Sequence, residues 1–148
     1  MKKVLKVLTV FMAVILVTGC GSNKKDKLSS EEFYNRINDS YKLTDITSKI
    51  DFVQKAYAYE KDGVLIYFYE GNRTFDMGNI YIDEVQNVSG QMMDKKDSID
   101  KGENYSSITI YNDEEYYRIA YVDNTLLYAK GPKANQYMID EVFNKTGY

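Results

Sequence analysis

The aspartates that recur every three residues near the middle of the chain are the first side chains whose spacing could support chemistry. Asp94, Asp97 and Asp100 could gather the oxygen ligands that calcium prefers. Their spacing differs from that of an EF-hand loop, and lysines are interspersed among them. We therefore expect a solvated loop here and no metal site.

Few residue types remain for catalysis, because the chain has no histidine and one cysteine, Cys20. Ser-His and Cys-His nucleophiles and an ordinary zinc site are thereby excluded. The acidic runs at 83–84 and 113–115 are expected at strand ends and turns, and no pair is placed for acid/base catalysis. The segment 130–133 lacks the glycines and the Ser or Thr of a phosphate loop. We predict a protein that is not an enzyme and needs no cofactor. A glycosidase acting through carboxylates alone is a remaining hypothesis, and it requires two facing carboxylates about 5–10 Å apart.

Tyrosine is the residue type that the chain uses most conspicuously, with 15 copies. Its ring offers a large contact area and its hydroxyl can orient a ligand. Six tyrosines are candidates for binding a partner: Tyr57, Tyr59, Tyr67, Tyr69, Tyr111 and Tyr116. The first four could form an aromatic wall for a sugar, peptide or lipid, and the last two are predicted to lie opposite each other on an outer face. The alternative is that they only reflect β-propensity, because tyrosine suits a half-buried strand.

The first nineteen residues have the three parts of a secretion signal. Lys2, Lys3 and Lys6 give a positive start, and an apolar run follows over 7–17. That run is too short to span a bilayer, which takes about 20 residues. Its length is typical of the hydrophobic region of a signal peptide, so residues 1–19 are predicted to be one.

The end of this signal carries a motif that belongs to a known class. The sequence Val17-Thr18-Gly19-Cys20 resembles a lipobox, the site at which bacterial lipoprotein precursors are acylated and cleaved. The resemblance implies cleavage before Cys20 and a diacylglycerol on the Cys20 sulfur. It covers residues 1–20 only, and the chain beyond resembles no family we can name. Two acyl chains give stable attachment, so no second membrane signal is required. The alternatives are an uncleaved membrane anchor or a cysteine buried in an apolar helix.

Charge and composition bound the partners of the mature chain. Cleavage removes three lysines from 19 basic residues and none of the 22 acidic ones, which leaves a net charge of −6. An acidic domain argues against nucleic-acid binding, for which a basic patch is expected. Frequent Lys, Asn, Ile and Tyr indicate an AT-rich bacterial genome and a Gram-positive source. We expect a lipid-anchored protein on the outer face of the cell membrane. Lys24, Lys25 and Lys27 could attract anionic lipid or simply solubilise a tether.

The domain plan is a flexible tether over 20–28 and a single α+β domain over 29–148. A capping box of Ser29 and Glu32 predicts a helix over about 30–41, and a short second helix is expected over 44–50. The Gly-Pro pair at 131–132 predicts a C-terminal helix that Gly147 ends.

The chain between these helices is predicted to form an antiparallel sheet of about six strands. The Asp62-Gly63 turn predicts a hairpin that sets Tyr57 opposite Phe68 and Ala58 opposite Tyr67. Turns at 113–114 and 123–124 predict a three-stranded meander with one core face. A strand is expected over 79–88 and a long mobile loop over 89–104. The result is a sheet flanked by an N-terminal and a C-terminal helix.

Together these observations favour a cell-surface binding module, without enzymatic activity, for a protein, a peptide or an envelope component. The alternative is a lipocalin-like carrier, whose sheet closes into a barrel around an apolar pocket for a small ligand. The sequence leaves open which arrangement the sheet adopts.

Overall fold

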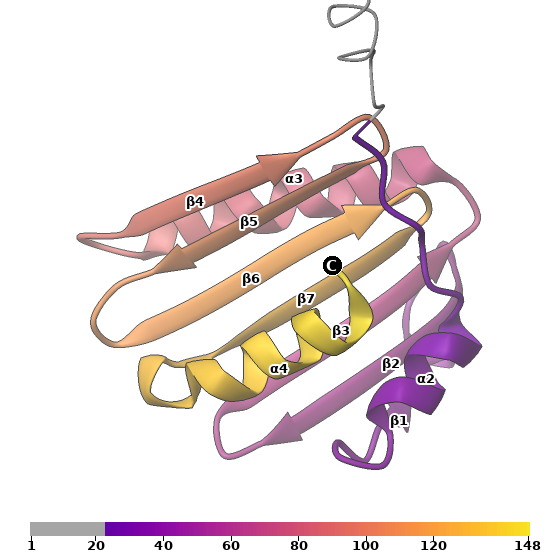
Figure 1. The fold of residues 1–148 in the computed structure, drawn as a ribbon, viewed down its shortest axis with the longest axis horizontal. Helices are drawn as coiled ribbons and strands as arrows, with labels where there is room; N and C mark the ends of the chain where they lie inside the picture. The colour runs from indigo at the N-terminus through magenta and orange to yellow at the C-terminus, as the bar shows by residue number, and fades with distance from the viewer. Residues whose placement is uncertain (1–22) are drawn as a thin grey trace, which may run out of the picture.

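The structure is a computed structural model that describes residues 23–148. It is an α+β fold with a seven-stranded antiparallel sheet in the order β1-β2-β3-β7-β6-β5-β4 (Figure 1). The strands are β1 (Thr44–Asp45), β2 (Val53–Lys61), β3 (Val64–Gly71), β4 (Lys96–Lys101), β5 (Tyr105–Tyr111), β6 (Glu115–Val122) and β7 (Thr125–Pro132). The helices are α2 (Ser30–Ile37), α3 (Thr74–Gln91) and α4 (Gln136–Thr146), with 3-10 turns η1 (Thr47–Lys49) and η2 (Lys133–Asn135). Helices α2 and α4 cover one face of the sheet and α3 covers the other.

The predicted hairpins are confirmed in register. Tyr57 pairs with Phe68 and Ala58 with Tyr67 across β2 and β3. The turn between these strands holds Asp62 at φ 54° and Gly63 at φ 77°, the positive values that a tight two-residue hairpin turn requires. The meander of β5, β6 and β7 also has the expected pairs.

The two terminal helices are confirmed, with shifted bounds. The capping box is present, since the Ser29 hydroxyl accepts from the Glu32 amide at 3.2 Å and the Glu32 carboxylate accepts from the Ser29 amide at 2.9 Å. Helix α2 ends at Ile37, four residues before the predicted end. Pro132 ends β7, so α4 begins only after η2, and Gly147 ends it at φ 81°.

The strand predicted over 79–88 is wrong, because this segment lies inside α3. Met77, Tyr81 and Val88 follow helical spacing and are buried on the face of α3 that contacts β6. Ile80 and Ile82 alternate in sequence as the buried residues of a strand do, but Ile82 is 51% exposed. Packing of the long apolar stripe on the sheet therefore decides the structure here.

Two further predictions are wrong at the edges of the sheet. The mobile loop expected over 89–104 contains β4, which pairs with β5 although all six of its residues are exposed. An edge strand of this kind is held by its backbone ladder, so it leaves no apolar alternation in the sequence. The second helix expected over 44–50 is instead β1 followed by η1, with Thr44 paired to Ala58.

Both faces of the sheet are covered, whereas the meander was expected to have one core face. Phe33 of α2 stacks on Phe68 of β3 at 4.2 Å, and Phe143 of α4 is fully buried on the same side. The strand order ends at β1 and β4, so the sheet is open rather than closed into a barrel. Within residues 23–148 no helix is long and apolar enough to cross a membrane.

The N-terminal predictions fall partly outside the described part of the chain. The signal sequence 1–19 and the lipidation site Cys20 lie outside it. Of the expected tether 20–28, residues 23–28 lie along the ends of the strands before α2 begins (Figure 1).

Candidate functional site

The six candidate tyrosines lie at three separate places. Tyr57 and Tyr59 face α2 and the chain that follows it, where they are half-buried. The ring of Tyr57 lies 5.2 Å from that of Tyr34, and the ring of Tyr59 lies 5.1 Å from that of Tyr41. Packing within the domain therefore occupies this pair.

Tyr111 and Tyr116 pair across β5 and β6 as predicted, with ring centroids 6.2 Å apart. The face that they share was expected to be an outer one, but the C-terminal segment covers it. Tyr116 is 5% exposed and donates a hydrogen bond to Asp140 of α4 at 2.7 Å. The ammonium group of Lys133 lies 4.0 Å from the ring centre of Tyr111, a cation–π contact.

Tyr67 and Tyr69 lie on the opposite face of the sheet, beside α3. The two rings stack at 6.2 Å, and Tyr67 also stacks on Tyr128 of β7 at 6.1 Å. We call these three residues the tyrosine ladder. Burial, with the charge of Glu84 adding to it, raises the pKa of both Tyr69 and Tyr128 well above the ordinary value. Both hydroxyls are protonated at neutral pH, as in an ordinary tyrosine, and the raised pKa extends that state to higher pH.

Glu84 is a member of this site that the sequence reasoning missed. It was expected at a strand end but lies in the middle of α3. Burial raises the pKa of its carboxyl group, the charge of Asp83 adds to this effect, and the charge of Lys130 opposes it. The signal that could have located it is the spacing of Met77, Tyr81 and Val88, which places Glu84 beside the buried stripe of a helix.

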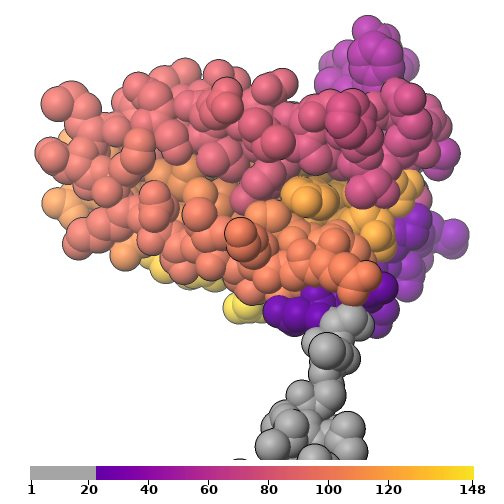
Figure 2. Space-filling view, turned by 90° about the horizontal axis from the view of Figure 1, so that it is seen from above, coloured from indigo at the N-terminus to yellow at the C-terminus, as the bar shows by residue number. Residues whose placement is uncertain are grey.

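A groove opens beside the ladder, and Tyr67 is the ladder residue that lines it. Helix α3 contacts β3, β5, β6 and β7, and the face of β2 beside them is left to the short segment around η1. The groove has a volume of about 420 Å³ and is lined by Lys42, Thr44, Ile46, Lys49, Ile50, Ala58, Glu60 and Tyr67. We call it the tyrosine groove. Figure 2 shows the η1 segment standing out on the same side of the molecule as α3.

The outer wall of the tyrosine groove is fixed by local hydrogen bonds. The Asp45 carboxylate accepts from the Thr47 amide at 2.9 Å, and the Thr47 hydroxyl accepts from the Ala56 amide of β2 at 3.0 Å. Phe52 follows this wall with a φ of 67° and 73% exposure. A left-handed backbone is unusual for a bulky residue and often marks a functional segment. Hydrogen bonds thus hold the wall in place, and the exposed ring of Phe52 lies just after it in the chain.

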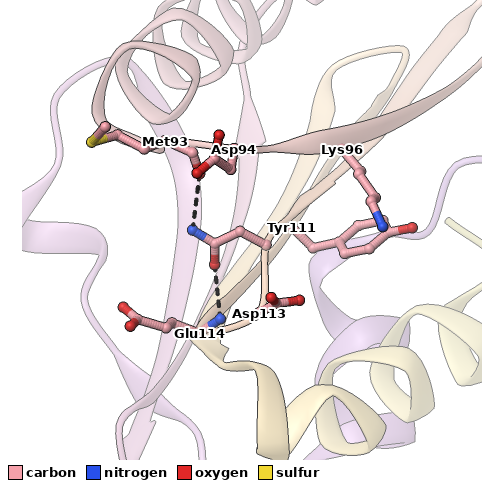
Figure 3. A pocket seen from close by; sticks show the side chains of 7 residues that line it. Met93, Asp94, Lys96, Tyr111, Asp113 and Glu114 are labelled. Carbon is pink, nitrogen blue, oxygen red and sulfur yellow. Dashed lines mark hydrogen bonds between the residues drawn. The ribbon is translucent and has the colours of Figure 1, made fainter.

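A second, acidic hollow of about 480 Å³ lies at the end of the sheet where the β5–β6 turn meets the start of β4 (Figure 3). Its lining is Met93, Asp94, Lys96, Tyr111, Asn112, Asp113 and Glu114, with three acidic residues against one basic residue. The Asn112 side chain holds it together, donating to the Met93 carbonyl at 3.3 Å and accepting from the Glu114 amide at 2.9 Å.

The aspartates considered first do not come together. Asp97 and Asp100 are three residues apart in β4, so their side chains point to opposite faces of the strand. In the part of the chain described here, no group of three or more His, Cys, Asp or Glu side chains is arranged to hold a metal ion.

Comparisons with known proteins give one structural similarity. No family model matches the sequence, and no curated protein matches it. The chain is similar to a crystal structure described as a GTP-binding regulator from Thermotoga maritima, with a TM-score of 0.49 and 16% sequence identity. The similarity covers 80% of this chain and 87% of that one.

Proposed function

We propose that the protein is a bacterial lipoprotein, held at the outer face of the cell membrane by a diacylglycerol on Cys20, that binds a protein or peptide partner without catalysing a reaction. The lysine-rich start, the apolar run of signal-peptide length and the lipobox-like motif support the anchor. An acidic mature chain without histidine supports a binding role more than a catalytic one.

The tyrosine groove is the observation that carries the binding role. Helix α3 covers one face of the sheet, but Tyr67 of the ladder also lines an open groove beside β2. Tyr67 offers a rigid aromatic surface on the floor, and Ile46 and Ile50 offer apolar contacts on the wall. Partner-binding sites concentrate their energy in such aromatic anchors.

The arrangement of the sheet favours a partner-binding module over the small-ligand carrier. The carrier hypothesis required a closed barrel around an internal pocket, whereas this sheet is open and both of its faces pack against helices. The tyrosine groove lies at the surface beside β2, where a segment of another chain has access.

Site-specific photo-crosslinking in the native host tests the proposal. A photoreactive phenylalanine analogue replaces Tyr67 in the full-length protein, and the same analogue replaces Tyr137 as the control. Tyr137 is 68% exposed on α4, on the other side of the sheet. We expect a discrete crosslinked protein or peptide from position 67 and none from position 137. Equal products from both positions, or none from position 67, would contradict the binding role.

An alanine substitution at the same position gives a second test of the binding role. Tyr67→Ala removes the floor of the tyrosine groove, so partner recovery with a chemical crosslinker should fall by about tenfold or more, the range for an aromatic anchor. Tyr137→Ala should leave recovery unchanged.

A further inference from the structure

Residues 23–28, which we call the strap, form a docked segment of the domain. The Asn104 side chain accepts from the Lys25 amide at 3.1 Å and donates to the Lys25 carbonyl at 2.9 Å. The Glu103 amide donates to the Asn23 carbonyl at 2.9 Å. Asn104 also donates to Asp123 at 3.0 Å, which ties the strap to the β6–β7 turn. One backbone hydrogen bond and the side chain of Asn104 therefore hold the strap on the domain.

Gly102 makes this close approach possible. A Cβ atom at position 102 would collide with the Asn23 carbonyl oxygen and with the ring of Tyr105. The strap thus lies directly on the bare backbone of the β4–β5 turn, and a side chain there would displace it.

The three lysines of the strap pair with the domain. The Lys24 ammonium lies 2.9 Å from the Glu103 carboxylate, and the Lys27 ammonium donates to the Asn124 side chain at 2.7 Å. The Lys25 ammonium lies 4.6 Å from the ring centre of Tyr105. Each exposed contact contributes little to stability by itself. Together with the buried side chain of Leu28, these contacts hold the whole strap on the domain.

The strap determines where a lipid on Cys20 must sit. Cys20 precedes Asn23 by three residues, so even a fully extended chain reaches about 10 Å from the docked point. The strap begins at the end of the sheet that carries the β4–β5 and β6–β7 turns (Figure 1). The β5–β6 turn and the acidic hollow lie at the other end, and β5 alone has a length of about 23 Å.

We infer that the docked strap makes the lipid anchor directional, so that the domain stands on the bilayer with its β4–β5 and β6–β7 turns against the headgroups and its β5–β6 turn pointing away. This inference rests on the proposed lipid anchor and adds an orientation to it. The surface that meets the lipid headgroups is the strap end of the sheet, and the acidic hollow is held in the surrounding medium.

Fluorescence quenching on vesicles tests the orientation. Cys20 is the only cysteine and its sulfur would carry the lipid, so one engineered cysteine can be labelled alone. Lys101→Cys marks the strap end and Asp113→Cys marks the far end, and both residues are exposed. The mature lipidated proteins are reconstituted in phosphatidylcholine–phosphatidylglycerol vesicles that contain a headgroup nitroxide lipid. We expect quenching at position 101 and none at position 113, whereas equal quenching at both would overturn the orientation.

Two variants that release the strap should remove this difference. Gly102→Ala introduces the collision with Asn23, and Asn104→Ala removes the two hydrogen bonds to Lys25 without adding bulk. Gly90→Ala is the matched control, because a Cβ there meets nothing within 4 Å. The quenching difference should be lost in both strap variants and kept in the control. If it survives in Asn104→Ala protein that remains folded by circular dichroism, the strap does not set the orientation.

Failure of the anchor is distinguished by flotation of the same samples. Protein that does not float with the vesicles contradicts the proposed lipid anchor itself. Protein that floats but is quenched equally at both ends contradicts only the orientation.

Discussion

Asp140 shows how single residues attach the C-terminal helix to the sheet. Its carboxylate accepts from Tyr116 at 2.7 Å, from Arg118 at 3.1 Å and from Gln136 at 3.0 Å. Burial works to raise its pKa, but these hydrogen bonds and the Arg118 charge outweigh burial and hold the pKa below the ordinary value of an aspartate. The ionised carboxylate is therefore favoured in the folded state, where its hydrogen bonds add to the apolar packing of α4 on the sheet.

The pH dependence of stability should reveal this carboxylate. A depressed folded pKa contributes stability that is present above the unfolded pKa near 3.8 and is lost as the pH falls through the folded value. Asp140→Asn should lower the free energy of unfolding at pH 7 by about 1 kcal/mol, and the loss should shrink below pH 4. Urea titrations of both proteins between pH 2.5 and 7 measure this difference in the free energy of unfolding.

The control for this prediction is Asp113→Asn, since Asp113 is exposed in the β5–β6 turn. It should change the free energy of unfolding by less than about 0.5 kcal/mol across the same pH range. A deficit in Asp140→Asn that stays constant down to pH 2.5 would contradict the role given to its charge.

At the scale of elements, α3 has the strongest consequences for the site, because its position decides which part of the sheet is left open. It contacts β3, β5, β6 and β7, with Met77 fully buried at its start. The tyrosine groove lies on the same side of the sheet, and the charge of Glu84 in α3 acts on Tyr69 and Tyr128. A strand in place of α3 would remove both features.

Substitutions along α3 distinguish the helix from the strand that its isoleucines suggest. Met77→Ala should lower the free energy of unfolding by about 2–5 kcal/mol, as expected for a buried side chain. Ile82→Ala should change it by less than about 0.5 kcal/mol, because Ile82 is 51% exposed and alanine favours a helix. Met93→Ala, at a residue 81% exposed, is the matched control for loss of a methionine. A large loss in Ile82→Ala would contradict the helix.

The elements that the sequence predicted well are those whose signals are local. The Asp62-Gly63 turn and the alternation beside it determine the register of β2 and β3 without help from the rest of the fold. The Ser29 cap likewise marks the start of α2 by a contact three residues away. β4 left no such mark, because an exposed edge strand is stabilised by its ladder to β5 and needs no apolar side chains.

The candidate site was harder to predict than the fold, for a physical reason. Period-two spacing indicated that Tyr67 and Tyr69 share a face, but which helix covers that face depends on packing between segments distant in sequence. Tyr116 was predicted on an open face because α4 covers it through side-chain contacts, such as the one with Asp140, between residues distant in sequence.

At the scale of the whole molecule, the two ends of the sheet have different surroundings in this account. The strap end carries the chain toward Cys20, and the far end carries the acidic hollow. The tyrosine groove opens on the side of the sheet that α3 shares with the η1 segment. A domain anchored through one end would keep its other surfaces available to partners.

The most direct test of this account is the intact mass of the protein purified from membranes of its native host. We predict a chain that begins at residue 20 and carries the added mass of a diacylglycerol on its single sulfur. A chain that begins at Met1 with an unmodified thiol at position 20 would contradict the lipid anchor, and with it the oriented surface module.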